Sequence, residues 1–304
     1  MFKGMKFKKV NPFDVFAYAF LTVFGFVNIW PVLYAFFGSL STNENVLNSV
    51  FLPKITDFSK ALAGFGEIFK DGDLIRSVAV TSLRILLHTV MGVSTSLIAG
   101  FVFARREFPG KNALFMVFMI TTMIPGVALT VPAYVFDSKF PLVGGNDILG
   151  RGGTGFINNP AMLFVFGWVS VYNIFLCRQN IVSIGGAYED AAEIDGAGFL
   201  GTIFLVYLPM LKPVCAVIFL NTFVGMWGDF MTCYIYLPDA YEWHTIGKKV
   251  ADLMEFYLNP NLGNGVAYPE CFAVSMVALI PPIAVFLSVQ KSFVAGMNLG
   301  GVKE

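Results

Sequence analysis

Three glycines, Gly196, Gly198 and Gly201, have the spacing G-x-G-x-x-G, which in other proteins holds the phosphates of a dinucleotide. That chemistry requires a strand before the glycines and a helix after them, within a βαβ unit. The residues from Tyr188 to Ile194 are instead helix-type, and the surrounding loop of about 35 residues is too short for a dinucleotide-binding domain. The sequence therefore favours a bend in a docking element over a phosphate site.

Other groups capable of catalysis are sparse. Gly247-Lys248 is followed by Lys249 rather than by Ser or Thr, so this chain carries no P-loop. The two histidines, His88 and His244, are far apart in the sequence, and the four cysteines stand singly with no C-x-x-C pair. We expect no enzymatic activity, no metal site and no cofactor bound by this chain.

The composition indicates an integral membrane protein. Of 304 residues, 56% are hydrophobic and 13% are charged, whereas soluble domains have about 25% charged residues. A soluble chain of this length cannot bury so much apolar surface in one core. The formal net charge is zero, so no basic surface suggests nucleic acid as a partner.

Six apolar runs have about the 17–25 residues that cross a bilayer as a helix. They cover residues 15–37, 78–104, 113–136, 157–177, 213–228 and 271–289, the second of them interrupted by Arg84 and His88. The first is too long for the apolar region of a signal peptide, so we expect it to be retained. The run 199–211 is kept separate, because Lys212-Pro213 is a natural break before a helix. We expect an all-α fold of six transmembrane helices in one domain, residues 1–304.

The orientation follows from lysine and arginine in the short loops. Segments 1–13, 105–112, 178–212 and 290–304 carry eleven of these residues, and segments 39–77, 137–156 and 229–270 carry eight. The first set is therefore expected in the cytoplasm, with both termini inside. The glycine motif then lies in the longest cytoplasmic loop.

That loop resembles a known motif. It is similar to the motif E-A-A-x3-G-x9-I-x-L-P of ABC importer permeases. The matching residues are Asp190-Ala191-Ala192, Gly196 after three further residues, and Val206-Tyr-Leu208-Pro209 after nine more. Two further segments resemble the carbohydrate-uptake branch of these permeases, and within it the second, maltose-type permease. They are the C-terminal segment from Gln290-Lys-Ser-Phe-Val-Ala-Gly296 to Lys303 and the segment Trp227-Gly-Asp229-Phe230. Leu142 to Gly155 looks like an external insert of some sugar permeases. The motif's Glu is Asp190 here and its Ile is Val206, and Gly228 replaces the usual Asn.

The resemblance implies a type I ABC importer permease in the inner membrane of a prokaryote. It implies a second, homologous permease chain, two cytoplasmic ATPase subunits that bind ATP and Mg²⁺, and an external sugar-binding protein. The loop 185–209 would couple this chain to an ATPase, and the residues carried over for that role are Glu189, Asp190, Ala191, Ala192, Asp195, Gly196, Leu208 and Pro209. The tail residues carried over toward the ATPases are Phe293, Gly296 and Lys303.

The residues themselves predict a short helix at 187–194. Ala187, Ala191 and Ile194 would share one face, where small side chains allow another surface to approach. The acidic side chains around them, Glu189 and Asp190 among others, would form a rim that meets basic residues of a partner. Gly196 would permit a turn that a residue with a Cβ resists. Gly198 and Gly201 would permit close packing.

Polar residues within the predicted spans are candidates for the substrate pathway. Arg84 would pair with Asp73 or Asp229, snorkel to the surface, or line the pathway, and the first two readings are preferred. Asn173 and Asn221 would bind sugar hydroxyl groups or bond between helices, with the second preferred. Trp227 is carried over from the resemblance. The aromatic residues Tyr172, Trp168 and Phe223 could stack on sugars, although packing is the commoner role.

Three other classes remain as alternatives. A secondary transporter needs acidic residues within its spans, and this chain has almost none there. A membrane enzyme needs a convergent set of His, Asp and Glu, which two separated histidines do not supply. An amino-acid ABC permease would share the loop motif but usually lacks this tail.

Overall fold

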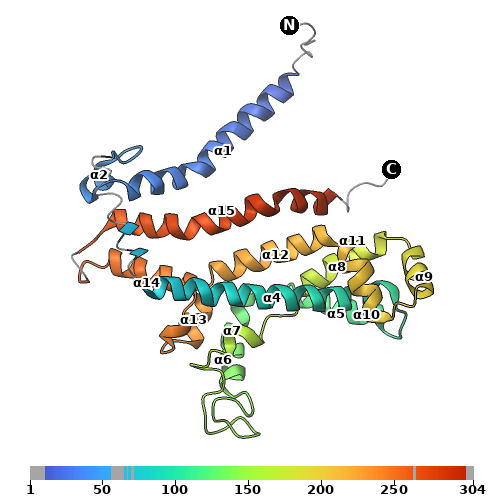
Figure 1. The fold of residues 1–304 in the computed structure, drawn as a ribbon. Coiled ribbons are helices and arrows are strands. Elements are labelled where there is room, and N and C mark those ends of the chain that lie inside the picture. The colour runs from blue at the N-terminus through green and yellow to red at the C-terminus, as the bar shows by residue number, and fades with distance from the viewer. Residues whose placement is uncertain (1–10, 56–64, 67, 70–71, 263–264, 299–304) are drawn as a thin grey trace. The chain divides into compact units, whose positions relative to one another are not determined.

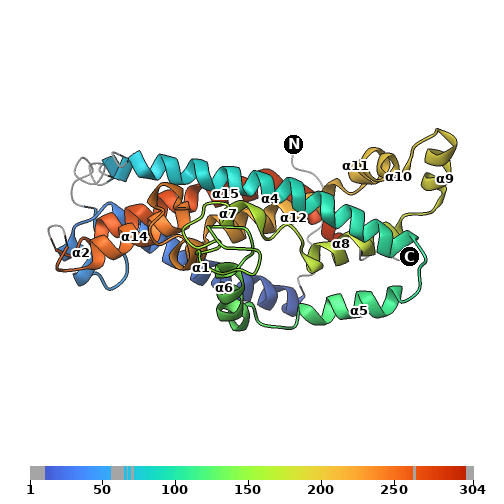
Figure 2. The ribbon, with the colours of Figure 1, turned by 90° about the horizontal axis from the view of Figure 1, so that it is seen from below.

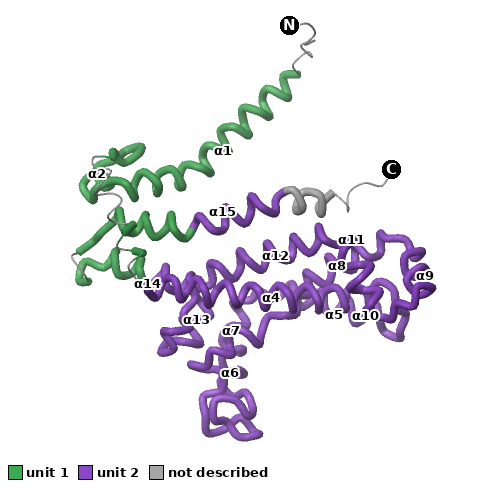
Figure 3. The backbone as a smooth tube through the Cα atoms, viewed as in Figure 1, with its two compact units in different colours: residues 1–70, 253–278 green, residues 71–252, 279–304 purple. Residues whose placement is uncertain are grey.

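The computed structural model describes residues 11–55, 65–66, 68–69, 72–262 and 265–298, and within these ranges all regular structure is helical. The helices are shown in Figure 1. The chain divides into two compact units (Figure 3). The first comprises residues 1–70 and 253–278, and the second comprises residues 71–252 and 279–304.

The first unit is built where the end of α1 (Pro12–Ser39) meets the start of α15 (Tyr268–Asn298). Tyr34 and Phe272 pack edge to face with ring centroids 5.7 Å apart. A Cβ on Gly38 would lie 2.5 Å from the Phe272 ring, so only glycine permits this approach. Asn43, which begins α2 (Asn43–Asn48), donates to the carbonyl of Val266 at 2.7 Å and accepts from the amide of Tyr268 at 2.8 Å.

The second unit contains most of the helices. In chain order they are α4 (Gly72–Arg105), α5 (Lys111–Thr121), η1 (Gly126–Leu129), α6 (Thr130–Ser138), α7 (Met162–Val165), α8 (Val171–Ser183), α9 (Ala187–Ile194), α10 (Phe199–Gly201), η2 (Thr202–Tyr207), α11 (Leu208–Met210), α12 (Lys212–Trp227), α13 (Met231–Tyr236), η3 (Tyr241–Trp243) and α14 (Ile246–Leu258), whose last residues lie in the first unit. Figure 2 shows α4, α8 and α12 running side by side, and these three helices contact one another.

One hydrophobic core of the second unit lies at the end of this bundle that leads to α9. Its fully buried residues come from α4, α8, η2 and α12 and the residue before α12: Leu97, Phe101, Cys177, Ile181, Ile203, Tyr207, Leu211, Val214 and Ile218. Gly100 brings α4 close to α8, because a Cβ there would lie 2.7 Å from Cys177 Cβ and 3.0 Å from the Arg178 amide nitrogen. The elements before and after α9 are therefore fixed to the long helix α4.

Among the described residues, three helices are long and apolar enough to cross a membrane: Pro12–Ser39, Gly72–Arg105 and Tyr268–Gln290. Two bent pairs pass the same test together, Lys111–Thr121 with Gly126–Ser138 at 91° and Phe199–Met210 with Lys212–Trp227 at 83°. The second bend occurs at the break that the sequence predicts before Lys212-Pro213. The number of six spans stays a prediction.

Two predicted spans are not continuous helices. The run 113–136 bends after α5, where Pro125 offers no amide hydrogen and holds the preceding residue away from helical geometry. The run 157–177 contains the four-residue helix α7, then an unwound segment 166–170, and only then α8. Gly167 has φ +92°, a left-handed conformation that interrupts a helix and favours glycine.

The predicted external insert is a compact loop between α6 and α7. The side chain of Asn146 organises it by donating to the carbonyls of Ser138 and Phe140 and accepting from the amide of Gly153. Asn146 is buried. Figure 1 shows this loop standing away from α4 and α12.

Candidate functional site

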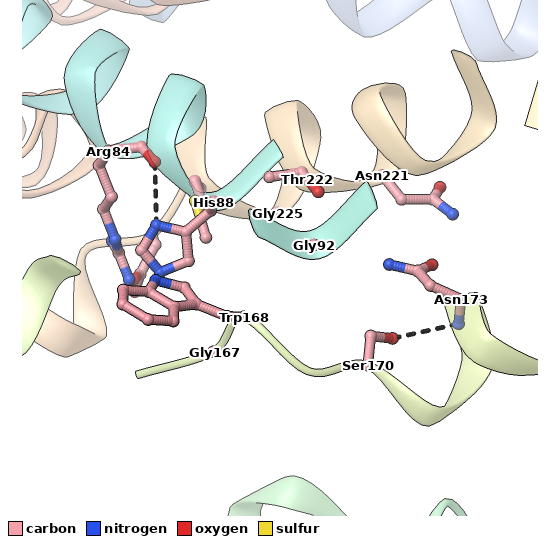
Figure 4. Close-up of a pocket in the computed structure, with 12 residues that line it drawn as sticks. Arg84, His88, Gly92, Gly167, Trp168, Ser170, Asn173, Asn221, Thr222 and Gly225 are labelled. Carbon is pink, nitrogen blue, oxygen red and sulfur yellow. Dashed lines mark hydrogen bonds and ion pairs between the residues drawn. The ribbon is translucent and has the colours of Figure 1, made fainter. Parts of the chain in front are cut away.

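A cavity of about 290 Å³ lies between α4, α12 and the unwound segment 166–170 (Figure 4). Four of the seven residues that the sequence suggested for the pathway line it: Arg84, Asn173, Asn221 and Trp168. The other lining residues are His88, Gly92, Gly167, Ser170, Thr222, Gly225, Met226 and Asp229. Trp227 does not line it, and its ring stacks on Phe223 with centroids 5.4 Å apart. The structure thus brings together polar residues that lie far apart in the sequence.

Arg84 forms an ion pair with Asp229 at one end of the cavity, with 2.7 Å between Nη1 and Oδ2. Thr232 donates its hydroxyl to Oδ2 and its amide to Oδ1 of the same carboxylate. Burial alone would raise the pKa of Asp229, but the charge of Arg84 and the bonds from Thr232 outweigh it and lower that pKa below its usual value. Of the two partners suggested for Arg84, the structure selects Asp229, while Asp73 pairs with Arg76.

His88 supports the unwound segment from α4. Its Nε2 lies 2.7 Å from the carbonyl oxygen of Phe166, and its Nδ1 lies 2.9 Å from that of Arg84. Thr95, two turns further along α4, donates to the carbonyl of Trp168 at 2.8 Å. Side chains of α4 therefore satisfy carbonyls that the broken helix leaves open, which is how membrane proteins accommodate irregular backbone beside a cavity.

Several polar groups in the cavity have no partner within the described chain. Arg84 Nε and Trp168 Nε1 are buried donors without a hydrogen bond there. The side-chain amides of Asn173 and Asn221 also form none among these residues. Their predicted bonds between helices are therefore not present within the described part of this chain.

A second candidate site is the predicted docking helix, and α9 has the predicted bounds, Ala187–Ile194. It ends just before Gly196, which has φ +81°. The amide of Gly196 donates to the carbonyl of Glu193 at 3.0 Å, and that of Ala197 donates to Ala192 at 2.8 Å. Such bonds around a left-handed glycine are typical of a Schellman-type helix end. The motif glycine therefore ends a helix, whereas the first glycine of a dinucleotide fingerprint follows a strand.

The side chains of α9 divide between two faces. Ala192 is buried against the body of the unit, while Ala187, Ala191 and Ile194 are exposed, with 86% of Ile194 accessible. Asp190 and Asp195 are also exposed. Figure 2 shows α9 beyond α10 and α11 at one end of the second unit. The alanine-bearing face is therefore open to a partner.

Glu189 differs from the expected acidic rim, because it faces inward. Its Oε1 lies 2.5 Å from Nε of Arg105 and accepts a short hydrogen bond from the hydroxyl of Tyr207. Arg105 also donates to the carbonyls of Ile181 and Ile184 at the end of α8. Sequence reasoning missed Arg105 and Tyr207, since the pattern of α9 alone does not reveal which of its carboxylates finds a cation in the same chain.

The remaining predicted coupling residues lie in α11, in α15 and outside the described residues. Leu208 and Pro209 lie in α11, just before the 83° bend. A Cβ would meet nothing within 4 Å at Gly198 and only Ala197 at 3.5 Å at Gly201, so the close packing expected there is absent within the described chain. Phe293 and Gly296 lie in the last turns of α15, and Lys303 lies outside the described residues.

Residues 92–298 match the family model of the binding-protein-dependent transport system inner membrane component. The chain belongs to this family. That match includes the docking helix, its Gly196 turn and most of the cavity lining. Among the described residues, no three His, Cys, Asp or Glu side chains are grouped to hold a metal.

Curated relatives of the permease are transport-system permeases of similar length. It is 25% identical over 298 residues to the polygalacturonan/rhamnogalacturonan transport system permease protein of Bacillus subtilis (strain 168), covering 96% of this chain and 98% of that protein. It is 24% identical over 294 residues to the galactooligosaccharides transport system permease protein of the same organism, covering 95% of each. It is 30% identical over 227 residues to the maltose/maltodextrin transport system permease protein of Yersinia pestis, covering 73% of this chain and 69% of that one.

A solved structure has the same fold. It is a chain of a bacterial ABC transporter involved in the import of the acidic polysaccharide alginate, with a TM-score of 0.73 and 22% sequence identity. The match covers 92% of the permease and 96% of that chain. At this identity the likeness establishes the fold alone.

Proposed function

We propose that the permease is the second transmembrane subunit of an ATP-driven importer of a sugar or oligosaccharide. In this proposal it forms half of the translocation pathway with a homologous permease chain. A sugar-binding protein delivers the substrate from outside, and two cytoplasmic ATPases bind ATP and Mg²⁺. The family membership supports the importer, and the three curated relatives named above, all permeases for saccharides, support the substrate class.

The observation that carries the proposal is the exposed face of α9. An eight-residue helix presents Ala187, Ala191 and Ile194 outward at the end of a bundle, on a turn that Gly196 fixes. Small side chains let this face enter a groove of an ATPase. The exposed carboxylates of Asp190 and Asp195 flank the face and suit basic residues on the partner.

The proposal includes six membrane spans in the type I arrangement, with both termini in the cytoplasm of a prokaryotic cell and loop 185–209 on the inner face. The exposed apolar side chains along α1, including Phe16, Phe20 and Phe24, suit contact with lipid. Transport energy comes from the ATPases, because a ligand shifts a conformational equilibrium only by binding one state more tightly than another. The tail at Phe293, Gly296 and Lys303 approaches the ATPase pair.

The test changes the size of one side chain on the open face. Ala191→Arg is expected to abolish co-purification of the ATPase and ATP-dependent uptake, since a long cation blocks a close approach. Ala191→Ser, of nearly the same size, is the matched control and should retain both. Equal membrane levels of the two variants separate docking from folding. Full uptake by the Ala191→Arg variant, at the level of the Ala191→Ser control, would contradict the proposal.

A further inference from the structure

We infer that the cavity beside Arg84 holds one ring of an uncharged sugar and disfavours a ring that carries a carboxylate. This inference rests on the proposed function, because it names the substrate class of that importer. It also assigns a saccharide contact to this subunit itself.

Two residues of the cavity lining carry buried donors. Arg84 is 8% exposed, and its Nε has no hydrogen-bond partner within the described chain. Trp168 Nε1 is likewise buried without one among those residues. A buried donor without a partner is unfavourable, and an acceptor from a ligand would remove that cost. Sugar hydroxyl oxygens are acceptors of this kind.

The cavity lining contains one ion pair. The Arg84 guanidinium and the Asp229 carboxylate lie 2.7 Å apart and cancel one another. The other ionisable residue in the lining, His88, has both ring nitrogens against carbonyl oxygens, so neither is available to a ligand. A sugar carboxylate would therefore lose its hydration without gaining a free cation, and such burial is strongly unfavourable. A neutral ring avoids that cost.

Two side-chain amides belong to the cavity lining. Figure 4 shows the amides of Asn173 and Asn221 at the end away from Arg84. Each offers donors and an acceptor, as sugar hydroxyl groups do, and neither is used within the described chain. The volume of about 290 Å³ lies at the lower limit of the roughly 300–1,000 Å³ typical of ligand pockets. That volume suits one ring rather than a long chain.

The experiment compares pairs of disaccharides that differ only at carbon 6. A neutral galactose disaccharide is paired with its galacturonate counterpart, and a neutral glucose disaccharide with its glucuronate counterpart. Binding of each to the complete permease–ATPase complex in lipid nanodiscs is measured by saturation-transfer NMR, without the binding protein, so that the selectivity of that protein does not enter. We expect at least one neutral member to bind about ten-fold or more tightly than its uronate, as the burial cost of an unpaired carboxylate requires.

Variants locate the effect in this cavity. Asn221→Ala removes an exposed amide and is expected to weaken neutral-sugar binding by about five-fold or more. Asn221→Lys adds a cation without touching the Arg84–Asp229 pair and should narrow the preference against the uronate. Asn180→Ala is the matched control, because Asn180 lies on the same helix as Asn173, donates to the carbonyl of Leu176 and does not line the cavity. It should leave binding unchanged.

Three results would overturn the inference: a uronate that binds as well as its neutral partner in both pairs, unchanged binding in Asn221→Ala, or no binding of any probe by a complex that imports a saccharide. ATP-dependent uptake of uronates alone, in proteoliposomes with the binding protein, would also overturn it but leave the proposed function standing. Absence of ATP-dependent uptake for every saccharide tried would instead contradict the proposed function.

Discussion

Arg105, the last residue of α4, holds Glu189 of α9 through an ion pair with 2.5 Å between Nε and Oε1. The same helix carries Arg84 and His88 beside the cavity, about 30 Å and 25 Å away at a rise of about 1.5 Å per residue. One continuous helix therefore runs from the contact with α9 to the cavity. In the proposed coupling, a movement of α9 by an ATPase would reach the cavity wall through the Arg105–Glu189 pair.

Glu189→Gln tests that connection. The variant removes the charge partner of Arg105 and leaves a weaker, neutral acceptor, in a pair whose side chains are 19% and 26% exposed. We expect a local loss of about 1.5–3 kcal/mol, seen as faster amide hydrogen exchange in residues 187–194. ATP-dependent uptake should fall several-fold while ATP hydrolysis persists, because the ATPase then moves α9 while the contact between α9 and α4 is weakened.

Glu193→Gln is the matched control, since Glu193 lies on the same helix, is exposed and forms no ion pair within the described chain. It should leave exchange and the ratio of uptake to hydrolysis unchanged. Equal effects of the two variants would mean that the net charge of α9, and not the contact with Arg105, matters for coupling.

Gly196 gives a second prediction, which depends on backbone angle rather than on size. Its φ is +81° and a Cβ would meet nothing within 4 Å. Gly196→Ala should therefore cost about 1–2 kcal/mol from the left-handed conformation alone, and larger β-branched residues should cost more. Gly196→Asn should retain most uptake, because asparagine tolerates this conformation.

Uptake and protein level in the membrane are measured for Gly196→Ala, Gly196→Val and Gly196→Asn. The sequence predicts a turn here that a residue with a Cβ resists, and the open space around Gly196 means that this resistance comes from the residue's own backbone rather than from a neighbouring side chain. A variant series in which loss follows side-chain volume, with Asn worse than Ala, would contradict this explanation.

The helical class and the bounds of α9 were predictable because they depend on local composition. Hydropathy marks long apolar helices, and a run of alanines and acids ended by glycine has one preferred local structure. The same reasoning placed a break before Lys212-Pro213, where the chain turns by 83°. These features need no knowledge of distant residues.

The cavity and the inward face of α9 were less predictable, because they depend on residues far apart in the sequence. The hydropathy of residues 157–177 predicts one continuous span. In the structure, Gly167 and the side chains of His88 and Thr95 stabilise an unwound segment there. From the sequence, Arg105 is predicted to be a cation in a loop at the end of an apolar run. In the structure it forms an ion pair with Glu189 and donates a hydrogen bond to the hydroxyl of Tyr207. Such contacts follow from packing rather than from local pattern.

Gly100 provides a third prediction, on helix packing. A Cβ there would lie 2.7 Å from Cys177 Cβ and 3.0 Å from the backbone nitrogen of Arg178, which cannot move without shifting α8. Gly100→Ala is expected to destabilise the permease by about 1–3 kcal/mol through overpacking, measured as a lower melting temperature in detergent. Gly25→Ala, in α1 with nothing within 4 Å, is the control and should not lower it. A stabilised Gly100→Ala variant would show that α4 and α8 are not in close contact.

The fourth prediction concerns the Arg84–Asp229 pair, whose side chains are 9% and 18% exposed. Arg84→Met leaves a carboxylate without its cation in a largely buried place and should cost about 3–5 kcal/mol, whereas the double variant Arg84→Met with Asp229→Leu should recover a large part of that loss.

Thermal unfolding of the purified permease in detergent measures both variants. Arg76→Met is the matched control, because Arg76 lies on the same helix and pairs with Asp73 at 53% and 60% exposure, where an ion pair contributes about 0–1 kcal/mol. It should barely change the melting temperature. If the single Arg84 variant is as stable as the Arg76 control, the pair does not hold the cavity wall, and the charge balance assigned to the cavity loses its structural basis.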